Sequence, residues 1–331
     1  MRCDLFLVGD AVHNDPAAVP RNLLRYAVAA EKCGFGGVWL AEHHFIRYGA
    51  CPSTPVMAAS ILSATRRLTV GTAACVLSNR HPVALAEEAV MLDGLSNGRF
   101  RLGVARGGPW IDLEVFGTGH ERFESGFVET LDVLLSWFRQ SRVSSDGRFF
   151  TFRPVPVRAR PGEGFTVWIA ATSAATVDVA AQRGLPLLLG VHTTDTEKAA
   201  MVHRWRRVAV EHGHDADAIE HAAVYLAFAD DDDDRAASRL RGPMTEWLST
   251  GVGDYRRVDG TKGSADQSAY VDRLIETHLV GNPARSARRL RTSMQAGGVG
   301  RALLMVEGAA SPDEVEANIT RLAHELLPNV N

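Results

Sequence analysis

Apolar, strand-like segments alternate with amphipathic, helix-like segments along the whole chain, and this alternation restricts the fold more than any other feature of the sequence. The strand-like segments are residues 3–8, 37–40, 68–74, 100–104, 166–170, 186–189, 223–228 and 301–306. The helix-like segments that follow them are residues 21–33, 55–64, 82–95, 126–139, 174–183, 197–212, 283–295 and 312–326. Eight βα units without a linker predict a single domain, 1–331, of the α/β class, folded as one (β/α)8 TIM barrel. A doubly wound open sheet is the alternative, although no GxGxxG follows the first strand.

The alternation is interrupted twice, and both interruptions predict insertions into the barrel. After the fourth strand, residues 141–164 hold Asp146-Gly147 between β-prone residues, which predicts a short hairpin. After the seventh strand, residues 251–267 are rich in Gly, Asp, Arg and Ser, which predicts a mobile loop that closes over the site. The aspartates at 230–234 are expected to begin a helix and to face solvent, and calcium-loop spacing does not follow them.

Length, charge and cysteine usage limit the class of protein. The 331 residues, 46% of them hydrophobic, are enough for a large core. The formal net charge of −3 gives no electrostatic footprint for nucleic acid, and no apolar run approaches the roughly 20 residues that span a bilayer. The N-terminus becomes acidic too soon for a signal peptide, and the four cysteines show no CxxC spacing. We therefore expect a cytoplasmic protein with reduced thiols and with neither a nucleic-acid nor a membrane partner.

The second strand leads into the stretch VWLAEHHF, residues 38–45, which places Glu42, His43 and His44 where a parallel barrel binds its ligand. Imidazoles titrate near neutral pH, so either histidine is a candidate for acid–base catalysis. A zinc site is the alternative, but it would need a third ligand from a distant strand, and we predict no metal. Strand alternation lets only one of the two histidines face the barrel mouth unless the strand ends between them.

Three other strand ends carry candidate binding residues. Hydroxyl groups and free backbone N–H groups at a helix N-terminus suit a phosphate, and an arginine nearby would add charge-assisted hydrogen bonds. Plain helix capping by serine or threonine is the alternative for the hydroxyl groups. The residues at these strand ends are Ala73, Ala74 and Cys75, then Arg106, then Thr172 and Ser173 with Thr176 one turn later.

Several stretches spread over nearly the whole chain match one enzyme family. They are CGFGGVWLAEHHF, VGTAACVL followed by HPV, LDGLSNGRFRLGVARG, VFGTGHERF, AAQRGLPLLL and HLVGNPARSARRL. Each stretch alone is a weak signal, but together they are specific. On these stretches the chain resembles the bacterial luciferase-like flavin-dependent monooxygenases, and the α subunit of luciferase in particular.

The resemblance implies a TIM barrel that binds FMN at its C-terminal face. A separate flavin reductase would supply the reduced FMN, since the sequence holds no nicotinamide-binding fingerprint. Reduced flavin would react with dioxygen through a flavin hydroperoxide and oxidise a small organic substrate. The family commonly dimerises through barrel helices, and the apolar segment 55–64 would suit a homodimer interface.

The resemblance also implies roles for individual residues. His43 aligns with the catalytic base of the luciferases and His44 with its neighbour, while Asp112 matches an acidic residue of their site. We expect His44 or Asp112 to hold His43 in one tautomer. Ala73 and Ala74 align with a non-proline cis peptide bond behind the flavin ring.

The phosphate-binding positions of the family are matched less uniformly. Arg106, Ser173 and Thr176 align with them directly. An ungapped alignment puts Glu124 at the second arginine, and Arg122 could serve there only if the loop shifts by two residues.

Two departures from the family pattern fall beside the expected flavin. The reactive cysteine of the luciferases is Ala105 here, and the glutamate that precedes the phosphate-binding serine is Thr172. These changes keep flavin binding plausible but weaken the expectation of light emission and of a long-chain aldehyde substrate. Two other functions stay open: hydride transfer with the deazaflavin coenzyme, and the role of a non-catalytic flavin-binding partner subunit.

Overall fold

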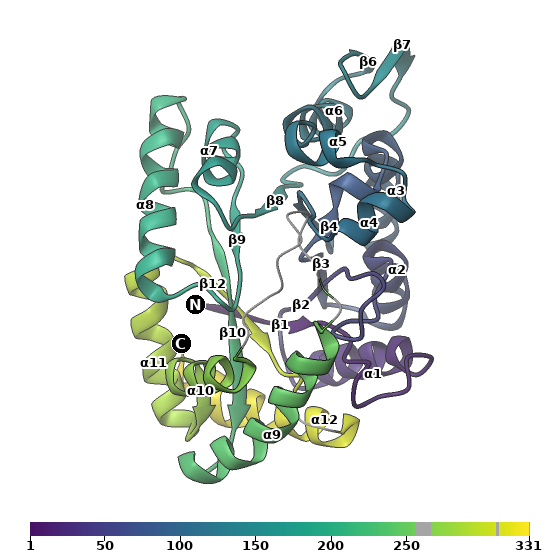
Figure 1. The fold of residues 1–331 in the computed structure, drawn as a ribbon. Coiled ribbons are helices and arrows are strands. Elements are labelled where there is room, and N and C mark those ends of the chain that lie inside the picture. The colour runs from purple at the N-terminus through teal and green to yellow at the C-terminus, as the bar shows by residue number, and fades with distance from the viewer. Residues whose placement is uncertain (254, 256–265, 309–310, 331) are drawn as a thin grey trace.

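Eight parallel strands form a closed barrel in the computed structural model, which describes residues 1–253, 255, 266–308 and 311–330 (Figure 1). The barrel strands are β1 (Arg2–Leu7), β2 (Gly37–Leu40), β3 (Thr69–Thr72), β5 (Phe100–Ala105), β8 (Val167–Ala170), β9 (Leu187–Leu189), β10 (Ala222–Ala229) and β12 (Arg301–Met305). Neighbouring strands pair in this order, and the circle closes because β12 pairs with both β10 and β1. Leu5 of β1, for example, pairs with Val38 of β2 and Leu304 of β12. The predicted (β/α)8 barrel is therefore confirmed, and the open doubly wound sheet is excluded.

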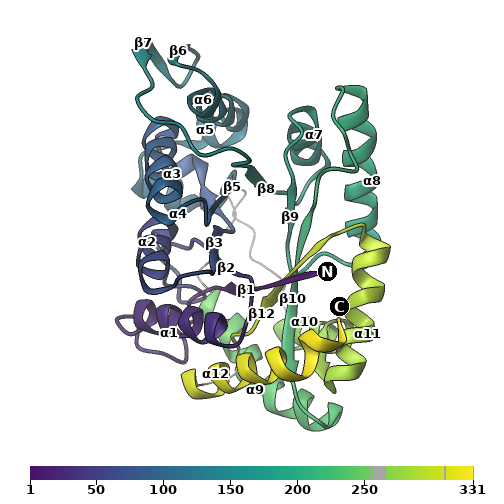
Figure 2. The same cartoon turned by 180° about the vertical axis from the view of Figure 1, so that it is seen from behind.

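Helices cover the outside of the barrel (Figures 1 and 2). Their bounds are α1 (Val19–Lys32), α2 (Thr54–Ala64), α3 (Pro82–Ser96), α6 (Phe127–Arg139), α7 (Ala174–Gln182), α8 (Asp195–Glu211), α9 (Asp233–Gly251), α10 (Gln267–Thr277), α11 (Pro283–Gly297) and α12 (Pro312–Arg321), which a π-helical turn continues (Leu322–Leu326). Proline stands in the first turn of α2, α3, α11 and α12, where its missing N–H breaks no helical hydrogen bond. Asn97 ends α3 in the left-handed conformation, with a φ of 53°. Within the described ranges, no helix combines the length and the apolar character that crossing a membrane requires.

Both predicted insertions are present. After β5 come two short helices, α4 (Trp110–Val115) and α5 (His120–Ser125), then α6 and the hairpin of β6 (Arg142–Asp146) and β7 (Thr151–Pro156). The hairpin was predicted; α4 and α5 were missed because six residues are too few to show a helical period. After β10 come α9, α10 and a short strand, β11 (Leu279–Gly281), which pairs with β10 outside the circle. Most of the loop predicted at 251–267 lies outside the described residues.

The lower half of the barrel, at the N-terminal ends of its strands, is filled by two tryptophans. The rings of Trp39 and Trp168 pack edge to face with centroids 5.3 Å apart. Gly71 makes room for this, because a Cβ there would overlap the Trp39 ring. Trp39 Nε1 donates to Asp4 Oδ2 at 2.9 Å, and Asp4 is paired with Arg301 at 2.6 Å. This tryptophan plug leaves the C-terminal face as the end of the barrel where ligands can enter.

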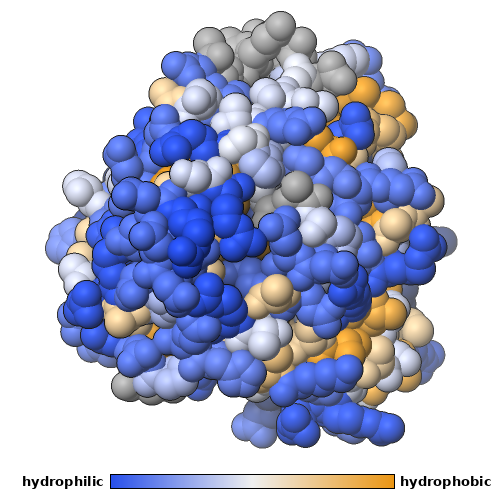
Figure 3. Space-filling model, turned by 90° about the horizontal axis from the view of Figure 1, so that it is seen from below, coloured by the Kyte–Doolittle hydropathy of each residue, from blue (hydrophilic) through white to orange (hydrophobic). Residues whose placement is uncertain are grey.

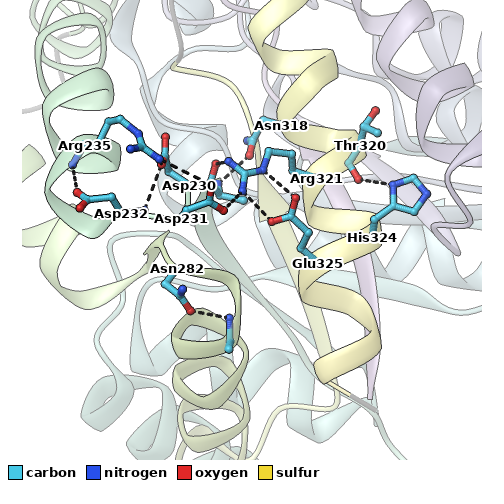
Figure 4. Close-up of polar contacts among 12 residues, drawn as sticks. Asp230, Asp231, Asp232, Arg235, Asn282, Asn318, Thr320, Arg321, His324 and Glu325 are labelled. Carbon is cyan, nitrogen blue, oxygen red and sulfur yellow. Dashed lines mark hydrogen bonds and ion pairs between the residues drawn. The ribbon is translucent and has the colours of Figure 1, made fainter.

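Several aspartates of the run at the end of β10 contact arginines and do not simply face solvent (Figure 4). Asp230 is buried, and its carboxylate accepts hydrogen bonds from Arg235 and Arg239. Asp231 accepts from Arg321 at 2.6 Å, and Asp232 caps α9 by accepting from the backbone N–H of Arg235 at 2.7 Å. The helix start was predicted correctly, but the prediction that these acids face solvent is wrong for Asp230. The run serves to join α9 and α12 at one barrel end.

Two buried histidines are expected to make the fold acid-sensitive. His221 Nδ1 accepts from Leu187 N, and His278 Nδ1 accepts from Leu226 N, each at 3.1 Å. Burial lowers the pKa of both histidines to about 4. As the pH falls below about 6.5, these histidines bind protons in the unfolded chain but not in the folded chain. The free energy of unfolding therefore decreases as the solution becomes more acidic.

We expect each of these histidines to remove about 2 kcal/mol of unfolding free energy between pH 7 and pH 5. Urea unfolding of the wild type and of His278→Gln at both pH values measures this, because the glutamine oxygen can still accept from Leu226 N but does not titrate. The variant should lose less stability on acidification than the wild type. Equal losses in the two proteins would contradict the assignment.

Candidate active site

A cavity of about 400 Å³ lies at the C-terminal ends of β2, β5 and β8. It gathers most of the side chains that the sequence singled out, although they come from four separate parts of the chain. Ala105, Gly107 and Gly108 give it a wall with little side-chain bulk. The predicted site residues that line it are His43, His44, Arg106, Asp112, Thr172 and Thr176.

The other predicted residues lie beside the cavity or apart from it. The peptide bond between Ala73 and Ala74 is cis, as the resemblance implies, and follows β3 next to the end of β2. Ser173 is exposed at the start of α7. Arg122 is absent from the cavity lining, but it lies with Arg106 along a narrower crevice that Leu77 and Phe127 also line.

A larger hollow, of about 560 Å³, lies at the opposite end of the barrel. Its charged residues are largely occupied with one another: Arg301 donates to Asp4 at 2.6 Å and to Glu220 at 2.9 Å. In (β/α)8 barrels this face supports stability while the opposite face carries the chemistry. The smaller cavity is therefore the candidate active site.

His43 and His44 both reach the cavity, because β2 ends at Leu40 and strand alternation does not extend to them. The Nδ1 atom of His43 is buried against Gly49, and no described residue hydrogen-bonds to it. Burial lowers the pKa of His43 to about 4, so this imidazole is neutral at neutral pH. In the described structure neither His44 nor Asp112 hydrogen-bonds to His43, so the prediction that one of them fixes its tautomer is wrong.

His44 is held by Glu42, which the sequence placed at the same strand end without assigning it this role. Its Nε2 atom lies 3.2 Å from Oε1 of Glu42, whose side chain is fully buried. The His44 ring also packs edge to face on Phe116, with centroids 4.9 Å apart. No group of three or more possible metal-binding side chains occurs among the residues that the structure describes.

Asp112 reaches the cavity from α4 with one oxygen atom paired and the other free. Its Oδ2 accepts from Asn79 Nδ2 at 3.0 Å, while its buried Oδ1 has no partner in the described part of the chain. Burial raises the pKa of this carboxyl group. A ligand with a hydrogen-bond donor would satisfy Oδ1, since a buried acceptor left without a partner is costly.

The basic and hydroxyl side of the cavity lies between α7 and α5. Ser173 Oγ accepts from Thr176 N at 3.3 Å and lies 3.0 Å from Thr176 Oγ1, which caps α7 as the sequence allowed. The Arg106 guanidinium stacks on Phe123 at 4.7 Å and makes no hydrogen bond or ion pair with the described residues. Arg122 Nη2 donates to the backbone oxygen of Arg80 at 2.6 Å. The hydroxyl groups at the start of α7 and the nearby arginines together offer hydrogen-bond donors to an anion.

Sequence reasoning missed three residues that shape this site: Thr54, Asn79 and Arg80. Each contacts a catalytic candidate that lies 12 to 38 positions away along the chain. Arg80 stands next to the HPV stretch on which the resemblance rests, and this is the only signal that could have drawn attention to it. Nothing in local periodicity shows that it folds back onto the end of β2.

Comparisons with known proteins agree with this picture. The family model described as luciferase-like monooxygenase matches residues 1–322. The alkanal monooxygenase alpha chain of the Kryptophanaron alfredi symbiont is 30% identical over 334 aligned positions, which cover 95% of this chain and 94% of that protein.

Solved structures share the fold at lower identity. Monooxygenase RslO1 from Streptomyces bottropensis has a TM-score of 0.88 at 21% identity, with all of both chains covered. An F420-dependent secondary alcohol dehydrogenase in complex with an F420–acetone adduct has a TM-score of 0.79 at 18% identity, covering 100% of this chain and 99% of that one. The oxygenating constituent of 3,6-diketocamphane monooxygenase from Pseudomonas putida, in complex with FMN, has a TM-score of 0.77 at 16% identity with the same coverage.

The three structures establish the fold, and the family model and the alpha-chain relative extend over nearly the whole sequence. The histidine pair, the buried carboxylates and the basic and hydroxyl side of the cavity lie where such a barrel places its chemistry. This chain belongs to the luciferase-like monooxygenase family and is an enzyme of the oxidoreductase class.

Proposed function

We propose that this protein is a flavin-dependent monooxygenase that takes reduced FMN from a separate reductase and uses dioxygen to oxidise a small organic substrate. One observation carries the proposal: a single cavity joins two histidines and a buried aspartate to an arginine and a helix N-terminus. A phosphate-bearing cofactor and a proton-dependent reaction need these two sets of groups side by side. Two of the similar proteins support the proposal by their names: the alkanal monooxygenase alpha chain, and the FMN-bound 3,6-diketocamphane monooxygenase, which is a Baeyer–Villiger monooxygenase.

The residues present fit the phosphate of FMN. A phosphate group between Arg106 and the start of α7 would accept hydrogen bonds from the guanidinium and from the hydroxyls of Ser173 and Thr176. The dipole of α7 favours negative charge at this end. Arg122 would serve as the second arginine from the adjoining crevice, whereas the carboxylate of Glu124 faces solvent and pairs with His120 at 3.5 Å.

The flavin ring fits the remainder of the cavity. Ala105 and the glycines after β5 present little bulk, and the cis peptide bond of Ala73 and Ala74 would lie behind the ring. The free oxygen of Asp112 would accept a hydrogen bond from a ring N–H. Bound reduced FMN would supply the activation of dioxygen. The protein would then orient the substrate, exclude water, and move protons through His43 and His44.

The test is isotopic. Purified protein is supplied with FMN, a flavin reductase and NADH under ¹⁸O₂, and a panel of aldehydes, ketones and aromatic compounds is screened by mass spectrometry. We expect one ¹⁸O atom in a product and no product without the protein. Products that carry only solvent oxygen, or none across the panel, would count against a monooxygenase.

Hydride transfer with a deazaflavin is a second candidate, because the F420-dependent alcohol dehydrogenase shares the fold. It predicts turnover of an alcohol or ketone without oxygen, with F420 and not with FMN. A non-catalytic flavin-binding partner subunit, the third possibility, predicts FMN binding without turnover under either condition. The same protein assayed with both cofactors, with and without oxygen, separates the three.

We also propose a homodimer that forms through α2 and α3. Val56, Met91 and Leu95 are large apolar side chains on these helices, and their exposed fractions are 71%, 64% and 77%. Figure 3 shows hydrophobic residues along the right-hand side of the molecule, which is the side of α1, α2 and α3 in Figure 1, while the left-hand side is mostly hydrophilic. Large apolar side chains exposed on neighbouring helices are typical of an interface.

We expect Leu95→Glu to convert the dimer to a monomer, because the interface would have to bury an unpaired carboxylate. Light scattering of the wild type and the variant measures the mass. Val210→Glu on α8 is the matched control, since that valine is 62% exposed on a different helix. The control should stay dimeric, and a wild type that is monomeric on its own refutes the proposal.

A further inference from the structure

We propose that His44 is the proton donor of the site and that Glu42 is the positioning residue that orients its ring, while His43 acts as the neutral base. This division of roles rests on the monooxygenase proposed above. It comes from the surroundings of the two imidazoles, which are adjacent in sequence but differ in every contact. One site can provide both an acid and a base when its two titratable groups lie in different environments.

Besides its contact with His44, the Glu42 carboxylate accepts hydrogen bonds from three donors, which favours its ionised form. Oε1 lies 3.2 Å from His44 Nε2 and accepts from Val76 N at 3.3 Å. Oε2 accepts from Arg80 Nη2 at 3.0 Å and from Thr54 Oγ1 at 3.3 Å. A protonated carboxyl group would place its own hydrogen against one of these donors.

These contacts fix the orientation of the His44 ring. An ionised carboxylate can only accept, so Nε2 of His44 must carry a hydrogen atom. Nδ1 is then the ring nitrogen that His44 can offer to a molecule in the cavity that it lines. In His43 the order is reversed: Nδ1 is buried against Gly49, which leaves Nε2 for the cavity.

The surroundings of the two rings differ: a carboxylate is hydrogen-bonded to His44, whereas burial disfavours a proton on His43. A His44 imidazolium would have the Glu42 carboxylate 3.2 Å away. His43 has no such hydrogen-bonded carboxylate and is buried, which lowers its pKa to about 4. The other titratable or charged groups that face this region are Tyr48, Cys51, Cys75, Arg80, Arg106, Asp112 and Tyr255.

The two thiols and Arg80 do not supply a competing proton. Burial raises the pKa of both Cys51 and Cys75 to about 12, so the thiols stay neutral. Arg80 is held against Glu42 on one side and Glu88 on the other, at 3.0 and 3.6 Å. Arg80 therefore partly offsets the Glu42 charge without removing it.

The proton balance of the step is simple. The N–H bond at Nδ1 of His44 would break as an O–H bond forms on the oxygen atom of dioxygen that becomes water, and the O–O bond would break. Bound reduced FMN would supply the two electrons and the second hydrogen of that water, and neither histidine changes its oxidation state. Solvent returns the proton to His44, and Glu42 stays ionised throughout, since its part is to hold the ring in place.

The decisive experiment needs no cofactor. The protein is labelled with ¹⁵N-histidine, and the ring nitrogens of His44 are followed by NMR as the pH is changed, with His44→Gln used to assign the signals. We expect neutral His44 to carry its hydrogen on Nε2. Glu42→Gln should lower the pH midpoint of His44 protonation by about one pH unit or more, because an adjacent opposite charge is lost.

A second substitution keeps the test decisive if Glu42→Gln does not fold. Arg80→Gln should move the His44 midpoint in the opposite direction, to higher pH, because the cation that offsets Glu42 is gone. Glu88→Gln is the matched control, since Glu88 contacts Arg80 but not Glu42, and it should leave the midpoint unchanged. A His44 ring with its hydrogen on Nδ1, or a midpoint that neither substitution shifts, overturns the proposal.

The NMR result and the ¹⁸O result can fail separately. A shifted His44 midpoint in a protein without oxygenase activity would overturn the proposed function and leave the Glu42–His44 pairing standing. An active oxygenase with an unshifted midpoint would overturn the proton-donor assignment alone. In an active enzyme, Glu42→Gln should also move the loss of activity at high pH to lower pH by the same amount, a change that mere loosening of the fold would not produce.

Discussion

Replacing His43 with alanine is expected to leave FMN bound and to slow turnover by about 10²- to 10⁴-fold. The ring lines the same cavity as His44, and its buried Nδ1 makes no hydrogen bond with the described residues. Burial keeps it neutral at pH 7, so it can accept a proton at Nε2 but cannot store one. The substitution therefore removes a base while leaving the phosphate end of the site intact.

Two measurements separate these effects. FMN affinity is followed by fluorescence quenching, and turnover by substrate-dependent oxygen consumption coupled to the reductase. His324→Ala is the control, because this exposed histidine contacts only the backbone oxygen of Thr320 in the described structure. Wild-type turnover in the His43 variant would remove His43 from the mechanism, and loss of FMN binding would make its role structural.

The second large effect is expected at the phosphate end of the site. Arg106→Gln should weaken FMN binding by about 100-fold, the equivalent of about 2.8 kcal/mol, because a charge-assisted pair with the phosphate is lost. No described residue hydrogen-bonds or ion-pairs with this guanidinium, so the substitution breaks no internal salt bridge. Riboflavin has the same ring system without the phosphate, and its affinity should stay nearly unchanged.

The comparison of FMN with riboflavin makes this test specific. Arg183→Gln is the matched control, since Arg183 follows the far end of α7 and pairs with Asp132 at 2.7 Å. The control removes the same charge as Arg106→Gln, but at a position that does not line the cavity. Equal losses for FMN and riboflavin in the Arg106 variant would show a disturbed ring site, and no loss for either would place the phosphate elsewhere.

The barrel could be predicted from the sequence because the hydrophobic pattern of each βα unit can be identified within about 20 residues. The segment 37–40 was predicted with the bounds that the structure gives it, and Pro82 marked the start of α3. Once the strands were placed, the rule that ligands bind at their C-terminal ends brought His43, Arg106 and Thr176 into one list. The structure places these three side chains around one cavity.

The contacts that decide the chemistry could not be predicted in the same way. The pairing of Glu42 with Arg80 joins residues 38 positions apart through a turn that has no periodic signal. Alternation along a strand applies only while the strand lasts, and β2 stops before His43. The short helices after β5 place Asp112, yet they are too brief for a hydrophobic pattern to identify.

The edge-to-face pair of Trp39 and Trp168 closes the barrel below the active-site cavity. The active-site cavity and the hollow beneath the tryptophans have no lining residue in common among the described positions. A ligand that enters the cavity at the C-terminal face must therefore leave through the same opening. The ligand that lies deepest in the cavity has to bind first and dissociate last. We therefore expect an ordered kinetic mechanism, which follows from two side chains inside the barrel.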